Sequence, residues 1–122
     1  MTVLFPFVCS SKNIIKTALL APEGSSWMNI MHEFNNELEK NTRGEVLLKM
    51  YPGGVLGDEK DVIRKMLHGQ VHAAGFTGMG LGEILSEVRI FELPFLFQNA
   101  SEVDYLTSAF FSEYSQLFEK KK

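Results

Sequence analysis

The order in which strand and helix patterns alternate constrains the fold of this chain more than any other feature. Apolar runs at residues 13–20, 45–51 and 71–76 indicate strands, and the first run is too continuous for a half-exposed strand. A helical pattern follows each run after a short connection, and the last one continues from Ser101 to the chain end. This order predicts an α/β fold with a mainly parallel sheet and helices on both faces.

The pattern also predicts where the first two helices begin, where the first one ends, and which side chains they bury. Ser25 or Ser26 can cap the first helix, Gly44 suits the left-handed position after it, and Asp58 can cap the second. The first helix carries one apolar stripe, formed by Trp27, Ile30, Met31, Phe34 and Leu38. The buried stripe of the second helix is Val62, Ile63, Met66 and Leu67.

The chain after the third strand is expected to be mostly apolar and helical. A short helical piece at 81–85 leads to apolar segments at 88–91 and 93–97, and Ser101 is the expected cap of the last helix. The apolar positions of that helix are Val103, Leu106, Phe110, Tyr114, Leu117 and Phe118.

Charge and composition exclude two classes of function. The chain of 122 residues has a formal net charge of −3, so it lacks the basic surface that nucleic-acid binding requires. No stretch is long and apolar enough to span a bilayer. With 45% hydrophobic and 22% charged residues, the chain has the composition of a globular domain.

The segment YPGGVLGDEKDV, residues 51–62, places three glycines before a helix start. Glycine-rich loops of this kind can bind phosphate, because their N–H groups and the helix dipole favour an anion. Here Asp58 and Glu59 occupy the helix mouth, and their carboxylates would repel a phosphate. The segment is therefore interpreted as a strand end, an open turn and a capped helix.

The residues that most often carry catalysis or metal ligation form no convincing set. His32, His68 and His72 are interpreted as surface or capping residues, since Gly69 interrupts the spacing between the last two. The single cysteine, Cys9, has no base that the sequence positions beside it. The sequence predicts no enzyme, no metal site and no cofactor.

Three loops follow the predicted strands, at residues 21–26, 52–57 and 77–80. In an open α/β sheet, ligands bind outside the carboxyl ends of the strands. These loops are the expected place for a small-molecule site, and simple turn chemistry is the alternative.

Several segments together resemble one protein family. They are IKTALLAPEGSSW at 15–27, NTRGEVLLKMYPGGVLGDEKDVIRKMLHGQVHAAGFTG at 41–78, and FELPFLF at 91–97. Over roughly residues 14–110, the chain resembles the amino-terminal part of the DctP-type substrate-binding proteins of tripartite ATP-independent periplasmic (TRAP) transporters.

This resemblance implies a periplasmic receptor, not an enzyme, with two α/β domains that close on a ligand. Such receptors capture small organic anions, carboxylates or sugar acids, for the membrane permease subunits of a TRAP system. Residues 13–122 would then form an incomplete first domain, a partial α/β ligand-binding lobe, and the chain would be truncated. The arginine with which the family binds a ligand carboxylate would lie beyond residue 122. Residues 1–12 are expected to be a disordered start or a signal-peptide remnant.

The resemblance also implies a set of ligand-facing residues. Each has an alternative interpretation as a cap, a turn residue or core. The predicted ligand-binding residues are Pro22, Glu23, Gly24, Trp27, Asp58, Glu59, Thr77, Gly78, Met79 and Phe95.

Two other functions remain open at this stage. A stand-alone α/β domain could self-associate through an open sheet edge as an interaction protein. A flavodoxin-like enzyme or cofactor carrier is the third hypothesis, which the acidic helix mouth at Asp58 and Glu59 disfavours.

Overall fold

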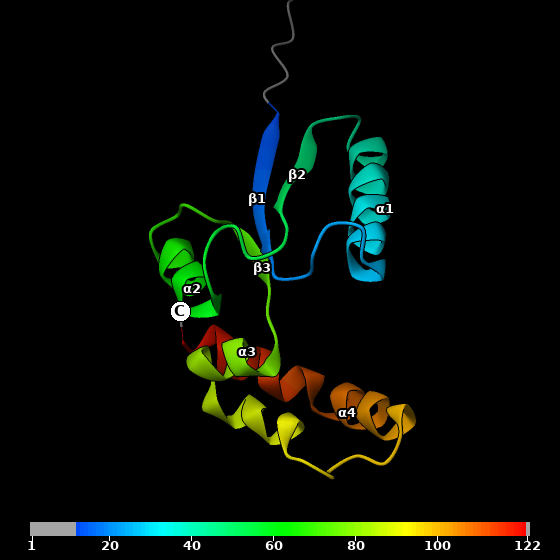
Figure 1. Ribbon diagram of the computed structural model, residues 1–122, viewed down its shortest axis with the longest axis vertical. Helices are drawn as coiled ribbons and strands as arrows, with labels where there is room; N and C mark the ends of the chain where they lie inside the picture. The colour runs from blue at the N-terminus through cyan, green and yellow to red at the C-terminus, as the bar shows by residue number, and fades with distance from the viewer. Residues whose placement is uncertain (1–11, 122) are drawn as a thin grey trace, which may run out of the picture. The chain divides into compact units, whose positions relative to one another are not determined.

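The computed structural model describes residues 12–121, and these residues form two compact units that divide after Gly75 (Figure 1). The predicted start or signal remnant, apart from Lys12, lies outside the described residues. The first unit contains β1 (Asn13–Leu19), α1 (Ser26–Asn41), β2 (Val46–Tyr51), α2 (Glu59–Leu67) and β3 (Ala73–Gly75). The second contains α3 (Gly78–Ile84), the 3₁₀ helix η1 (Ser86–Glu92) and α4 (Ala100–Glu119). Within residues 12–121, no helix has both the length and the apolar character needed to cross a membrane.

The sheet of the first unit has the strand order β2-β1-β3, and both strand pairs are parallel. Figure 1 shows α1 and α2 on opposite sides of it. The predicted α/β fold with a parallel sheet is therefore confirmed. The third strand, Ala73–Gly75, is shorter than the predicted 71–76. Just before it, Lys16 donates its N–H to Nδ1 of His72 at 3.2 Å, and the N–H of His72 donates to the carbonyl of Lys16 at 2.9 Å.

The buried core of the first unit lies around the carboxyl-terminal half of β1. Its most buried residues are Thr17, Ala18, Leu19, Met28, Leu48, Val62 and Val71. The start of β1 is different, because Ile14 is about half exposed. The prediction that both faces of this strand are covered is therefore wrong for its first residues.

Helix α1 buries only part of its predicted apolar stripe: Met31 and Leu38 are half-buried, and the other three residues are exposed. Trp27, Ile30 and Phe34 are 53%, 56% and 54% exposed, whereas Met28 is completely buried. The reason is a polar contact: the side-chain oxygen of Asn35 accepts the N–H of Leu48 at 2.6 Å. This bond sets the rotation of the helix, so much of the predicted apolar stripe faces solvent.

The outer edge of β2 is closed by the helix that precedes it. The N–H of Leu48 is bonded to Asn35, and the N–H of Val46 donates to Oγ1 of Thr42 at 3.1 Å. An edge strand whose N–H groups are already bonded is a poor template for another strand. Self-association through an open sheet edge stays a prediction.

Three of the four residues predicted at helix ends have the predicted role. Ser25 caps α1, Asp58 caps α2, and Gly44 has φ +78° after α1, as predicted. The cap of α4 is Asn99 and not Ser101, because Asn99 Oδ1 accepts the N–H of Glu102 at 3.1 Å.

Two further predictions for the helices are corrected, and α4 adds one observation. Leu67, predicted in the buried stripe of α2, is 80% exposed. Helix α3 begins at Gly78 and not at Leu81, because Thr77 supplies its cap. Helix α4 buries none of its residues completely.

We expect the Asn35→Ala substitution to destabilise the first unit by about 1–3 kcal/mol, because it leaves the N–H of Leu48 without its acceptor. Asn36→Ala, at the neighbouring exposed position of α1, is the matched control and should change stability by less than about 0.5 kcal/mol. Urea unfolding followed by circular dichroism measures both. Equal effects of the two substitutions would contradict the assigned role of Asn35.

Candidate functional site

The loops that follow β1 and β2 are bonded directly to each other. The N–H of Gly53 donates to the carbonyl of Ala21 at 2.9 Å, and the N–H of Gly54 donates to the carbonyl of Leu19 at 3.2 Å. Gly53 and Gly54 have φ of +65° and +69°, a left-handed conformation that glycine adopts without a steric penalty. Because β1 and β2 are parallel neighbours, both loops lie at the carboxyl-terminal edge of the sheet, where the strands end.

The first loop presents Pro22, Glu23 and Gly24, all exposed. A turn closed by the N–H of Ser25 on the carbonyl of Pro22, at 3.2 Å, shapes it. Oε1 of Glu23 lies 2.7 Å from Nε2 of His32, which lies in the second turn of α1. This contact fixes the direction of the Glu23 carboxylate relative to the loop.

The second loop leads into the acidic start of α2. Oδ1 of Asp58 accepts the N–H of Asp61 at 2.9 Å, so Asp58 has the predicted capping role. Glu59 is half-buried in the first turn. The side chain of Lys65 reaches back from α2 and donates to the carbonyl of Leu56, which ties the loop to the helix.

The positive charge of Arg64 compensates part of the negative charge at the start of α2. A hydrogen bond from the guanidinium of Arg64, together with its positive charge, holds the pKa of the Asp61 carboxyl below its ordinary value. An anionic ligand at this helix mouth would meet the carboxylates of Asp58 and Glu59. Arg64, the cation of the Asp61 pair, is already bonded to that carboxylate.

The remaining predicted site residues are divided between the units. Trp27 is exposed in the first turn of α1, directly after the first loop. In the second unit, Thr77 caps α3 by accepting the N–H of Gly80 at 3.5 Å, and Met79 is exposed. Phe95 is 98% exposed and has φ +63°, an unusual conformation for a bulky residue.

Gly78 has a packing role that the sequence did not reveal. A Cβ at this position would lie 2.6 Å from Oε1 of Glu92, so the carboxylate of Glu92 covers the start of α3. A larger residue here would require the exposed side chain of Glu92 to move.

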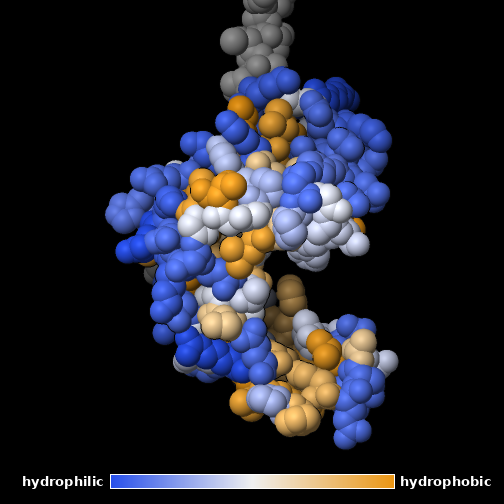
Figure 2. Space-filling view, viewed as in Figure 1, coloured by the Kyte–Doolittle hydropathy of each residue, from blue (hydrophilic) through white to orange (hydrophobic). Residues whose placement is uncertain are grey.

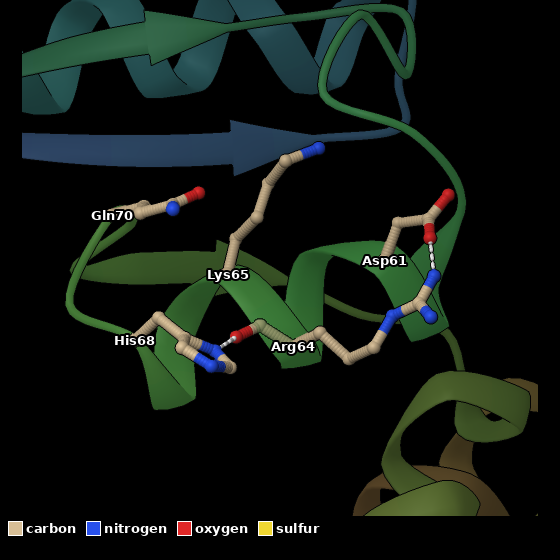
Figure 3. Close-up of a pocket in the computed structure, with 5 residues that line it drawn as sticks. All are labelled: Asp61, Arg64, Lys65, His68 and Gln70. Carbon is tan, nitrogen blue, oxygen red and sulfur yellow. Dashed lines mark hydrogen bonds and ion pairs between the residues drawn. The ribbon is translucent and has the colours of Figure 1, made fainter.

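A hollow of about 250 Å³ lies on α2 and is lined by Asp61, Arg64, Lys65, His68 and Gln70 (Figure 3). Figure 3 shows the Lys65 side chain extending toward the strands, while Arg64 and His68 lie on the other side of the helix. Arg64 is bonded to Asp61 and Lys65 to the carbonyl of Leu56. Both lysine and arginine side chains that line the hollow are therefore already bonded to other groups of the chain. Among residues 12–121, no three histidine, cysteine or acidic side chains gather as metal ligands.

A larger groove of about 400 Å³ lies within the second unit between α3, η1 and α4. Its lining is mostly apolar and comprises Gly78, Leu81, Val88, Phe91, Glu92, Thr107, Phe111, Tyr114, Ser115 and Phe118. Phe91 packs edge-on against Tyr114, with ring centroids 5.4 Å apart, which holds η1 to α4. Figure 2 shows apolar residues gathered over this part of the chain. The groove is an apolar surface with few groups that could orient a charged ligand.

Sequence reasoning missed two residues that hold the loops. His32 was interpreted as a surface residue, and its contact with Glu23 depends on how the loop folds back on α1. Lys65 was not singled out, although a lysine two turns into the helix can reach the loop that precedes it. Neither contact has a signal in the local sequence.

Comparison with known proteins identifies a related family. Residues 17–122 match the family DctP, described as "Bacterial extracellular solute-binding protein, family 7". The C4-dicarboxylate-binding periplasmic protein DctP of Vibrio cholerae is 27% identical over 88 residues, which cover 72% of this chain and 25% of that protein.

Two solved structures share the fold of this chain. A TRAP periplasmic solute-binding protein from Ochrobacterium anthropi with bound L-fuconate is 26% identical, with a TM-score of 0.79, and the match covers 91% of this chain and 37% of that one. A second, from Pseudomonas putida F1 with bound D-glucuronate, is 28% identical, with a TM-score of 0.70 and coverage of 79% and 31%. The chain thus spans about a quarter of the curated relative and about a third of the solved ones.

We expect Gly57→Ala to destabilise the chain more than Gly53→Ala, by at least about 1 kcal/mol. Both glycines have positive φ, but a Cβ at Gly57 would lie 2.6 Å from Oδ2 of Asp61, whereas a Cβ at Gly53 meets nothing within 4 Å. Thermal unfolding of the two variants measures the difference. An equal loss would show that the packing of Gly57 on Asp61 has no energetic consequence.

We expect Arg64→Gln to raise the pKa of Asp61 toward its ordinary value, because it removes the hydrogen bond and the charge that lower it. The lowered pKa means that Asp61 stabilises the fold above pH about 4 and that this contribution is lost as the pH falls through the folded-state pKa. Carboxyl ¹³C NMR titration measures the pKa. Arg43→Gln, in the turn after α1, is the control and should leave it unchanged.

Proposed function

We propose that this chain, which belongs to the DctP family of bacterial extracellular solute-binding proteins, serves as part of a receptor that captures a small organic anion for transport. The family and the fold are those of transport solute-binding proteins. The chain would correspond to the amino-terminal part of such a receptor and would have no catalytic role.

One observation of the structure carries this proposal. The loops after β1 and β2 are joined by the N–H groups of Gly53 and Gly54, which assembles the predicted ligand-facing residues 22–24 and 58–59 at one edge of a parallel sheet. That edge, outside the carboxyl ends of the strands, is where open α/β sheets bind ligands.

The names of the relatives support a proposal for the ligand class. Sugar acids occupy two solved relatives, L-fuconate in one and D-glucuronate in the other, and the Vibrio cholerae relative is named for a C4-dicarboxylate. We favour a sugar acid, because Glu23 and Asp58 offer carboxylate oxygens that can accept hydrogen bonds from sugar hydroxyls. A second carboxylate on the ligand would instead be repelled by them.

Membership of the same family supports a proposal for the location and the partners of the protein. The Vibrio cholerae relative is named as periplasmic, and the family is described as extracellular, which supports a periplasmic location for this chain. Delivery to the membrane permease subunits of a TRAP system is the corresponding step. In the second unit, Thr77, Gly78, Met79 and Phe95 stay predicted ligand-binding residues.

We expect this chain by itself to bind sugar acids only weakly, with dissociation constants in the millimolar range. The predicted ligand-facing residues include no lysine or arginine, and charge-assisted bonds to a carboxylate are the strong ones. Titration of ¹⁵N-labelled protein with L-fuconate, with neutral L-fucose as the matched control, measures affinity and location together.

The expected amide shifts lie in residues 21–25 and 52–59 and appear with L-fuconate more strongly than with L-fucose. Shifts confined to other residues, or none, would contradict the proposed site. Micromolar binding would contradict the view that this chain lacks the main carboxylate-binding group.

A further inference from the structure

Glu23 lies in a loop whose backbone is held on both sides of it. Before it, the carbonyl of Ala21 accepts a hydrogen bond from the second loop, and after it the N–H of Ser25 closes a turn on the carbonyl of Pro22. Ser25 also caps α1 with its side chain, which joins the loop to the helix. These contacts fix the backbone and leave the side-chain torsions of Glu23 to be set by another group.

His32 is presented to this loop by a part of α1 whose rotation is fixed. It comes four residues after Met28 and three before Asn35, so the three residues share one side of the helix. Met28 is completely buried, and the side-chain oxygen of Asn35 accepts the N–H of Leu48 at 2.6 Å. Turning α1 away from the loop would expose Met28 and break that bond, so the imidazole is held beside the loop.

The imidazole of His32 donates a hydrogen bond to Glu23. Nε2 lies 2.7 Å from Oε1, and an ionised carboxylate only accepts, so Nε2 is the donor. The two side chains are 47% and 60% exposed, and contacts between exposed charged groups add little to stability. The contact instead selects one orientation of the carboxylate. Because a carboxylate accepts several hydrogen bonds, Glu23 can bind a ligand hydroxyl while it stays bonded to His32.

We propose that His32 is a positioning residue of the ligand site: by holding the Glu23 carboxylate, it makes the site prefer polyhydroxylated acids to acids without hydroxyl groups. A carboxylate accepts from hydroxyls and repels other carboxylates, so its fixed position discriminates between ligands by their hydroxyl groups. Holding it in advance also reduces the entropy lost on binding. The inference rests on the proposed function, because it assigns a role at the same edge of the sheet.

The first experiment uses the free chain and measures whether His32 orients Glu23. In protein labelled with ¹³C-glutamate, three-bond couplings and the Cδ chemical shift report the side-chain torsions of Glu23. We expect His32→Ala to average the couplings. His32→Gln should keep them, because its amide nitrogen can donate in place of Nε2. Asn36→Ala, at an exposed position further along α1, is the control and should change neither signal.

The second experiment compares L-fuconate with hexanoate, an acid with the same number of carbons and no hydroxyl groups. Each is titrated into the variants while the amide signals of residues 21–25 are followed. We expect His32→Ala to weaken L-fuconate binding about threefold, within the range for exposed charged contacts, and to leave hexanoate binding unchanged. His32→Gln should restore the affinity. In a Glu23→Ala background, His32→Ala should have no further effect, because His32 acts through Glu23.

The proposal is overturned if His32→Ala leaves the Glu23 couplings or the L-fuconate affinity unchanged. Equal weakening of both acids, or an undiminished effect in the Glu23→Ala background, would also overturn it, because His32 would then have a general structural role. Each of these results can occur while L-fuconate still shifts the amides of residues 21–25 and 52–59, and the proposed function then stands. The absence of those shifts in the unaltered chain would overturn the proposed function and this inference with it.

Discussion

The hydrogen bond between the N–H of Leu48 and the side chain of Asn35 determines more of this structure than any other single contact. It joins β2 to α1 and so orients the helix on the sheet. It leaves Met28 inside and Trp27 outside, and it closes the β2 edge to other strands. A buried donor that lost this acceptor would cost free energy, so the arrangement resists change. The exposed apolar surface of α1 is a consequence of this polar contact.

The proposed ligand edge depends on a second set of backbone contacts. Gly53 and Gly54 use their left-handed conformation to direct their N–H groups at the carbonyls of Ala21 and Leu19. The same loop is anchored from α2 by Lys65. Both loops are therefore held on the sheet, which is the usual condition for a preformed binding edge. The edge is acidic, because Glu23, Asp58 and Glu59 belong to these loops and to the helix start that follows them.

Much of the fold could be predicted from the sequence, because strands and caps have local signatures. The strands, the parallel sheet and the capping roles of Ser25 and Asp58 follow from apolar runs and short polar side chains. The face of α1 could not be predicted, since the hydrophobic pattern gave no weight to Asn35, whose partner is 13 residues away. The cap of α4 was misplaced by two residues, because Asn99 and Ser101 have similar capping propensity.

The predicted site shows the same division between local and distant causes. The position of Pro22, Glu23 and Gly24 after a strand was evident from the chain order, as was the acidic start of α2. The contact of Glu23 with His32 and the approach of Glu92 to Gly78 depend on segments folding back on one another. Alone, the sequence determined the elements, their order and the family, because these depend on local propensity and on motifs along the chain. Only the tertiary structure decided which apolar face is buried and which loops meet, because those outcomes depend on contacts between residues distant in sequence.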